Sequence, residues 1–313
     1  MNKRIAILDL GTNTFNLLIA ELLGGENYKI LVNQKLPVKL GEKRINSGKI
    51  ISVAFNRGIE AIKSHFTTIK KYQVQDIKAY GTSALRTAKN GEKFLAEIRI
   101  ITGITVEIIS GDLEAELIYF GVRQTLNLKN EKFVILDIGG GSNEFILANM
   151  KGIIWKKSYP LGIARLFERF RPSDPISVKQ IEDIFLYLEE ELEDLFLELK
   201  KHNIEILVGA SGSFETFYTL VNNLEVSETE CDLDANSSDI TLNDYHMLYQ
   251  KLVKSTLKER KKMKGLEPMR VEMIVLASIF VEFILKKYNF KLVLRSNFAL
   301  KEGAVYKALK NRN

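Results

Sequence analysis

The stretch from Asp137 to Glu144 brings together two carboxylates, a hydroxyl and a run of glycines. Apolar residues lead into Asp137 and others follow Glu144, a pattern that predicts a strand, a tight turn and a second strand. Because the glycines carry no Cβ, backbone N–H groups in the turn can close on an anion. An ordinary glycine-rich hairpin would also explain a single copy. If the turn binds phosphate, its candidate binding residues are Gly139, Gly140, Gly141 and Ser142.

A second copy of this pattern begins at Asp9, near the N-terminus. Its loop consists of Gly11, Thr12, Asn13 and Thr14. The two copies superimpose at a constant offset of 137 − 9 = 128 residues. Two copies so far apart predict two related lobes that face each other across a cleft. A dinucleotide-binding dehydrogenase fits poorly, because the glycine turn at residues 139–142 enters a second strand instead of a helix.

A third glycine turn follows the predicted strand 204–208 and opens a helix from Phe214. Backbone donors and the helix dipole favour an anion at such a helix N-terminus. The turn's candidate phosphate-binding residues are Gly209, Ser211 and Gly212. Two arginines are predicted near the cleft: Arg86, in a helix that Thr82 and Ser83 can cap, and Arg165. Arg86 is a candidate phosphate clamp, with a plain surface arginine as the alternative.

Glu114 follows the predicted strand 105–109, in a helix that Ser110 or Asp112 caps. Carboxylates are common in a first helical turn, because they complement the dipole, and this structural explanation stays open for Glu114. Its place after a strand end favours a site role, since ligands collect at that edge of an α/β sheet.

The remaining pattern predicts helices over residues 51–72, with His65 on the flank, 91–102, 177–202 and 270–288, and strands over 28–36 and 291–295 before a terminal helix. Ser177 and Gln180 form a capping box at the start of helix 177–202, whose acidic face is expected to be solvated. In the basic stretch 251–264, residues Lys254, Lys258 and Lys261 are expected to share one helix face. Residues 226–239, which include Cys231, are predicted to be an exposed excursion.

Composition sets broad limits. The 313 residues are 46% hydrophobic and 27% charged, which allows two globular domains. One cysteine excludes an intramolecular disulfide framework, and the three histidines lack the spacing of a zinc site. No run of eighteen apolar residues and no leader pattern occurs, so we expect a cytoplasmic protein without a membrane partner. The formal charge of +6 suits an anionic ligand.

Together these motifs resemble the exopolyphosphatase / guanosine pentaphosphate phosphatase family across nearly the whole chain. The resemblance implies an α/β fold of two ribonuclease H-like lobes, the actin-like ATPase superfold, with mixed sheets flanked by helices and the active site in the cleft between the lobes. Residues 1–124 plus 297–313 would form one lobe and residues 125–296 the other. The longer members carry an additional C-terminal helical domain, so we expect a short form with limited processivity on long chains.

The resemblance also implies roles for the motif residues. Glu114 would be the catalytic carboxylate and Glu144 a second acid, while the two loops cradle phosphates and Arg86 holds the substrate chain. Asp137 and Asp9 would hold Mg²⁺. Two departures from the family pattern, Leu113 and Lys301, are expected to lie away from the chemistry.

The function implied is release of terminal phosphate from inorganic polyphosphate or guanosine pentaphosphate by attack of water. Two alternative functions stay open. One is an ATP-using kinase or ATPase of the same fold. Another is a non-catalytic sensor that binds polyphosphate or nucleic acid through residues 251–264, although that stretch is by default a solvated face. An acidic helix and a basic helix in one chain would also allow a homodimer.

Overall fold

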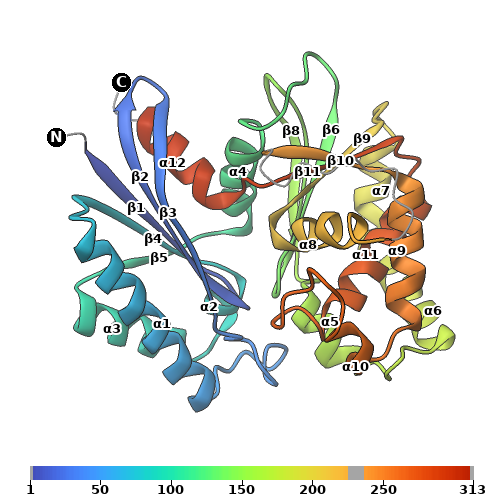
Figure 1. The fold of residues 1–313 in the computed structure, drawn as a ribbon, viewed down its shortest axis with the longest axis horizontal. Helices are drawn as coiled ribbons and strands as arrows, with labels where there is room; N and C mark the ends of the chain where they lie inside the picture. Colours follow the sequence, from blue (N-terminus) through green and yellow to red (C-terminus); the bar gives the residue numbers. More distant parts are fainter. Residues whose placement is uncertain (1–2, 225–235, 311–313) are drawn as a thin grey trace.

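The computed structural model describes residues 3–224 and 236–310, which form two β-sheets flanked by helices (Figure 1). The first sheet has the strand order β3-β2-β1-β4-β5. Together with its helices we call it the first lobe. Its elements in chain order are β1 (Arg4–Leu10), β2 (Thr14–Gly24), β3 (Asn27–Pro37), α1 (Ser52–Lys71), β4 (Asp76–Gly81), α2 (Ser83–Thr87), α3 (Gly91–Thr102), β5 (Val106–Ile108) and α4 (Gly111–Val122).

The second sheet has the strand order β10-β11-β9-β6-β7-β8, and with its helices we call it the second lobe. Its elements are β6 (Phe133–Ile138), β7 (Asn143–Asn149), β8 (Gly152–Tyr159), α5 (Ile163–Phe170), α6 (Val178–Glu191), α7 (Glu193–Leu199), β9 (Ile206–Ala210), α8 (Ser211–Val221), β10 (Ser237–Ile240), α9 (Leu242–Lys254), α10 (Leu257–Arg260), α11 (Ile274–Lys287) and β11 (Leu292–Ser296). The chain then returns to the first lobe in α12 (Leu300–Lys310).

The two sheets repeat one topology. In the first, β1 pairs antiparallel with β2 and parallel with β4. In the second, β6 pairs antiparallel with β7 and parallel with β9. The order β8-β7-β6-β9-β11 therefore matches β3-β2-β1-β4-β5. This duplication confirms the fold of two related lobes, while the boundaries at residues 124/125 and 296/297 stay a prediction.

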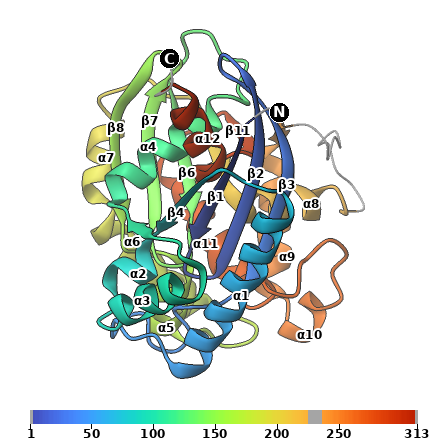
Figure 2. The same cartoon turned by 90° about the vertical axis from the view of Figure 1, so that its left-hand side faces the viewer.

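Apolar side chains divide the molecule into layers. One core lies between the first sheet and helices α1 and α3, which Figure 2 shows in front of that sheet. Another lies between the second sheet and helices including α6, α9 and α11. The central core lies between the two sheets and contains α4 and α12 (Figure 1). The two lobes thus share a hydrophobic layer.

Strand alternation aims the aspartates into the space between the lobes. Ile7 of β1 and Ile135 of β6 both belong to the central core. Because side chains two residues apart in a strand share a face, Asp9 and Asp137 point to the same side as these isoleucines. The apolar pattern of each strand therefore sets the direction of its carboxylate.

The acidic segment departs from the prediction. The capping box of Ser177 and Gln180 is confirmed. The single helix expected over 177–202 is wrong, because Leu192 (φ −112°, ψ 13°) separates α6 from α7. The buried apolar stripe continues across this break. The acidic face is not wholly solvated, since Asp194 accepts a hydrogen bond from the Tyr159 hydroxyl of β8 at 2.9 Å.

The basic segment is also broken. Helix α9 ends at Lys254, Ser255 is extended, and Thr256 and Glu259 form a new capping box that starts α10. The expectation that Lys254, Lys258 and Lys261 share one helix face is therefore wrong, because two caps interrupt the helix.

Most other predicted elements are confirmed. Helix α11 starts at Ile274, later than predicted, and it is buried from there to Ile284. His65 is buried and hydrogen-bonds the Phe15 carbonyl, a structural role. Thr82 precedes α2 without a side-chain capping bond, contrary to expectation. Cys231, with most of the predicted excursion, lies outside the described residues. In the described part of the chain, no helix is long and apolar enough to cross a bilayer.

Candidate active site

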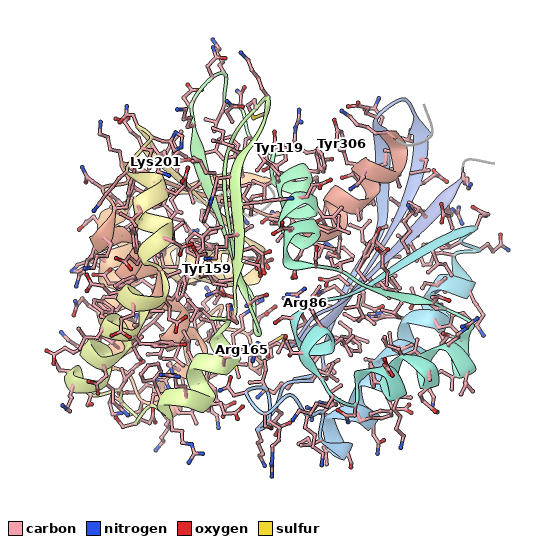
Figure 3. The ribbon with its side chains drawn as sticks, turned by 180° about the vertical axis from the view of Figure 1, so that it is seen from behind. Arg86, Tyr119, Tyr159, Arg165, Lys201 and Tyr306 are labelled. Atoms are coloured by element: carbon pink, nitrogen blue, oxygen red, sulfur yellow. The ribbon has the colours of Figure 1, made fainter. Side chains whose placement is uncertain are left out.

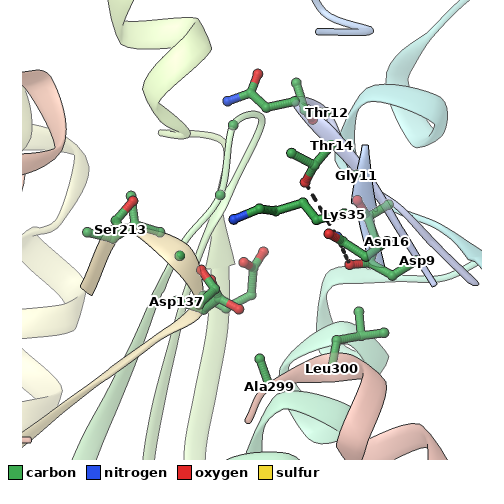
Figure 4. Close-up of a pocket in the computed structure, with 18 of the residues that line it drawn as sticks. Asp9, Gly11, Thr12, Thr14, Asn16, Lys35, Asp137, Ser213, Ala299 and Leu300 are labelled. Carbon is green, nitrogen blue, oxygen red and sulfur yellow. Dashed lines mark hydrogen bonds between the residues drawn. The ribbon is translucent and has the colours of Figure 1, made fainter. Parts of the chain in front are cut away.

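The predicted carboxylates meet in one pocket of about 450 Å³ between the lobes (Figure 4). Asp9 and Glu114 line it from the first lobe, and Asp137 and Glu144 from the second. Most of the predicted loop residues line it too, namely Gly11, Thr12, Asn13, Thr14, Gly139, Gly140, Gly141, Ser142, Ser211 and Gly212. The two hairpins that repeat at a constant sequence offset thus place their loops on opposite sides of one cavity.

Both loops close in the same way. The Gly11 N–H donates to the Thr14 carbonyl at 3.0 Å, and the Gly139 N–H donates to the Ser142 carbonyl at 3.0 Å. The loops also touch each other, because a Cβ on Gly140 would lie 2.7 Å from the Asn13 side chain. A side chain at position 140 would displace the Asn13 side chain.

The second loop turns its peptide carbonyls toward α5. The carbonyl oxygens of residues 139–141 accept hydrogen bonds, in order, from Ile163 N at 3.0 Å, Ala164 N at 2.9 Å and Arg165 Nε at 2.7 Å. In a trans peptide the N–H points opposite to the C=O. The N–H groups of Gly140, Gly141 and Ser142 therefore point away from α5, which makes the loop a set of aligned donors suited to an anion.

Thr12 supplies a further polar atom. Its side chain is 3% exposed, and its hydroxyl oxygen has no hydrogen-bond partner in the described part of the chain. Buried polar groups are nearly always satisfied, so an unpaired hydroxyl in a pocket indicates a ligand or water position. Thr12 thus adds to the donors that the two loops present.

The carboxylates of the second lobe are hard to ionise together. Burial, reinforced by Asp137, raises the pKa of Glu144 to about 7. Burial also raises the pKa of Asp137 to about 6, against a hydrogen bond from Ser211. The Ser158 hydroxyl donates to Glu144 at 2.7 Å. This carboxylate pair therefore favours a proton or a cation as its partner.

Glu114 lies in the first turn of α4. Ser110, not Asp112, caps this helix by accepting a hydrogen bond from Leu113 N at 3.1 Å. Burial raises the pKa of Glu114 well above its usual range, the Glu144 carboxylate adds to this, and the Arg86 guanidinium opposes it. Arg86 Nη1 lies 3.1 Å from Glu114 Oε2. A buried carboxylate with one cationic partner, in a cleft, is a candidate general base.

Comparison with known proteins decides the family. Residues 18–312 match the model of the Ppx/GppA phosphatase family. The chain belongs to this family.

Solved Ppx/GppA relatives share its architecture. A crystal structure of an exopolyphosphatase from Cytophaga hutchinsonii is 33% identical, with a TM-score of 0.93, and the match covers 99% of this chain and 98% of that one. The Aquifex aeolicus family member is 24% identical, with a TM-score of 0.82, over 100% and 99% of the two chains, which shows the fold. Exopolyphosphatase 1 of Mycobacterium leprae is 25% identical over 98% of this chain and 89% of its own length.

Two predicted phosphate ligands of this Ppx/GppA chain are not among the residues that line the pocket. Gly209 does not line the pocket, because it lies in β9 under the Phe214 ring, where a Cβ would be 2.0 Å from that ring. Close packing explains this glycine, and its assignment as a phosphate ligand stays a prediction without support from the pocket lining. Arg86 is not among the lining residues either, since its guanidinium contacts Glu114 and donates to the Ile109 carbonyl at 2.7 Å.

Sequence reasoning missed several lining residues. Lys301 was expected to lie away from the chemistry, but it lines the pocket and donates to Asn33 Oδ1 at 2.7 Å. Lys35 and Arg270 line it as well. No motif marks Lys35 or Arg270. Asn16 could have been found, because the offset of 128 that pairs the loops also pairs Asn16 with Glu144.

The donor set suits Mg²⁺. Oxygen ligands, above all carboxylates, are what this ion prefers, and it is commonly held by one or two carboxylates plus substrate phosphates and water. In the described residues, no three His, Cys, Asp or Glu side chains form a ready metal cluster. The raised pKa values of Asp137 and Glu144 indicate a place for positive charge. Asp137 and Glu144, which lie side by side in the second lobe, are the residues that would hold the ion, and the role of Asp9 in holding it stays a prediction.

Proposed function

We propose that this protein releases terminal orthophosphate from inorganic polyphosphate by metal-assisted attack of water. The observation that carries the proposal is the meeting of Glu114, two facing anion loops and a carboxylate pair in one pocket. The Cytophaga hutchinsonii and Mycobacterium leprae relatives, both named exopolyphosphatases, support this substrate.

The geometry suggests how the chain acts. The N–H groups of Gly140, Gly141 and Ser142 bind oxygens of the terminal phosphoryl group and stabilise charge there in the transition state. Glu114 orients a water molecule for in-line attack and accepts its proton, and its raised pKa brings it closer to neutral pH, where a general base is most effective. Bound Mg²⁺ would neutralise charge on the phosphates. The shortened polyphosphate leaves as an anion.

Guanosine pentaphosphate is a second substrate that we propose, because it presents the same terminal phosphoanhydride to the same pocket. A kinase or a non-catalytic sensor is distinguished by phosphate release, since neither would release phosphate from polyphosphate without an acceptor. The cytoplasmic location and a homodimer stay predictions from the sequence.

The test is orthophosphate release measured side by side on long polyphosphate, tripolyphosphate and guanosine pentaphosphate, with Mg²⁺ or with EDTA. We expect Mg²⁺-dependent release from at least one polyphosphate without any acceptor. Absence of release from all three substrates, or turnover only with ATP and an acceptor, would overturn the proposal.

A further inference from the structure

Arg165 contacts the second phosphate loop from behind. It lies in the first turn of α5, and its Nε donates to the Gly141 carbonyl at 2.7 Å. The other two loop carbonyls are held by backbone N–H groups of the same turn. Arg165 is therefore the side chain that orients the peptide between Gly141 and Ser142, and with it the Ser142 N–H.

The same guanidinium reaches the first lobe. Its Nη2 donates to Thr87 Oγ1 at 3.1 Å, and its Nη1 donates to the Ile45 carbonyl at 3.3 Å. The backbone of Arg165 is tied there as well, because its carbonyl accepts from Asn46 Nδ2 at 3.2 Å. Figure 3 shows Arg165 and Arg86 at the junction of the two lobes.

The first lobe also presses on the peptide that Arg165 holds. A Cβ on Gly141 would lie 2.6 Å from both Ser83 Oγ and Thr12 Oγ1. Thr87 in turn donates to the Ser83 carbonyl at 3.0 Å. The loop peptide thus lies between residues of the first lobe on one side and an arginine bonded to that lobe on the other.

We propose that Arg165 is a positioning residue that couples the approach of the two lobes to the shape of the phosphate-binding loop. The inference rests on the proposed function only in taking the ligand to be a phosphoryl group. A planar guanidinium has several donors in a fixed fork, so one side chain can bond both lobes at once. When the lobes separate, the fork loses its contacts with Thr87 and Ile45, and the Gly141 peptide is held less firmly. Closure of the cleft therefore completes the donor set.

The first test is calorimetric binding of orthophosphate, which needs no turnover. Arg165→Lys keeps the positive charge but loses the forked set of donors. We expect it to bind orthophosphate at least about tenfold more weakly than the parent protein, the effect of losing one charge-assisted hydrogen bond. Thr87→Val removes the contact of Arg165 with Thr87 and the bond from Thr87 to the Ser83 carbonyl but keeps the bond of Arg165 to Gly141, so affinity should fall less, by about twofold. Arg169→Lys is the matched control, because Arg169 is on the same helix but stacks 4.1 Å over the Tyr187 ring, and it should bind like the parent protein.

The second test is turnover of tripolyphosphate by the same variants. We expect kcat to fall more than about tenfold in Arg165→Lys and about three- to tenfold in Thr87→Val, because closure no longer tightens the loop. Methylguanidinium should restore part of the kcat of Arg165→Ala, which a merely structural loss would not allow.

The outcomes are separable. Unchanged orthophosphate affinity in Arg165→Lys overturns the coupling. A loss of kcat that parallels a fall in melting temperature, and that methylguanidinium does not restore in Arg165→Ala, also overturns it. If the parent protein binds orthophosphate but releases none from any polyphosphate, the proposed function fails while the binding comparison still decides the role of Arg165. If it binds no orthophosphate, the phosphate-binding loop and the coupling are both overturned.

Discussion

Asn16 and Glu144 occupy equivalent positions in the two hairpins, each paired across the strands with an aspartate. Asn16 Nδ2 donates to Asp9 Oδ2 at 2.9 Å, so the first pair is satisfied internally (Figure 4). An ionised Glu144 has no donor to offer Asp137, and burial leaves both pKa values raised. Because the second hairpin has a carboxylate where the first has an amide, the pair of Asp137 and Glu144 is the one that a cation would stabilise.

Glu144→Gln tests this difference. A carboxyl whose pKa rises from 4.5 in the unfolded chain to about 7 in the folded protein contributes stability below pH 4.5 that is lost as the pH rises through about 7. Without Mg²⁺, the variant should therefore melt higher than the parent at pH 8, by about 3 °C, the shift that ~1 kcal/mol produces. Calorimetric melting in EDTA at pH 5 and pH 8 measures this.

The same melting temperatures measured with Mg²⁺ test whether these carboxylates hold the ion. Mg²⁺ should raise the melting temperature of the parent protein more at pH 8 than at pH 5, because protons compete for the same carboxylates. Glu144→Gln should respond less. An equal response in parent and variant at both pH values would show that the ion is held elsewhere.

Glu114→Gln tests the general base. The amide keeps the shape of the side chain but cannot accept a proton from water, so kcat should fall more than about 100-fold while substrate affinity is largely kept. Single-turnover phosphate release and tripolyphosphate binding check both parts. Glu116→Gln is the matched control, two residues along the same helix and outside the pocket, and near-parental turnover in Glu114→Gln would refute the assignment.

At the scale of elements, the crossing of α4 and α12 positions Glu114. A Cβ on Gly303 of α12 would lie 1.8 Å from the Leu117 carbonyl, and one on Gly121 of α4 would lie 1.9 Å from the Ala299 carbonyl. The two helices therefore touch backbone to backbone. No side chain can be inserted there without moving α4.

Gly303→Ala should separate these helices. We expect an unfolding free energy lower by about 1–3 kcal/mol, the usual cost of overpacking, and a lower kcat because Glu114 moves with α4. Urea unfolding and phosphate release measure the two effects. Gly152→Ala serves as the control, since nothing lies within 4 Å of its Cβ position, and an unchanged Gly303→Ala protein would contradict the packing.

The two hairpins and the capping box at Ser177 could be predicted, because each is encoded within a few neighbouring residues. The break at Leu192 could not, because no glycine or proline marks it in the sequence, and the contact of Asp194 beyond it is with Tyr159 of a distant strand. Lys301 reaches the pocket only because α12 returns to the first lobe. Local sequence patterns thus predicted the loops and the carboxylates, whereas long-range packing brought Lys35 and Arg270 to the pocket without any local sequence signal.

At the scale of the whole molecule, ion pairs also join the lobes. Lys39 Nζ lies 2.9 Å from Glu272 Oε2, and Lys35 Nζ lies 3.0 Å from Glu267 Oε1. Both pairs are partly exposed, so each contributes at most about 1 kcal/mol. We expect them to favour this closed arrangement of the lobes without locking it.

Charge reversal in the pair of Lys39 and Glu272 tests this expectation. Lys39→Glu should favour an open cleft and lower kcat/KM by about two- to fivefold at low salt, with a smaller effect at high salt because of screening. The double variant Lys39→Glu/Glu272→Lys should recover the parental value. Failure of the swap to recover, with both proteins folded, would show that the pair does not act between the lobes.

The return of α12 to the first lobe has a consequence for biosynthesis. The N-terminal sheet leaves the ribosome first, yet the helix that packs on β1, β2 and α4 is translated only after every strand of the second sheet. Until then, the apolar face of β1 and β2 lacks its cover. The first lobe, whose strands are made first, is therefore completed only after all strands of the second sheet have been made.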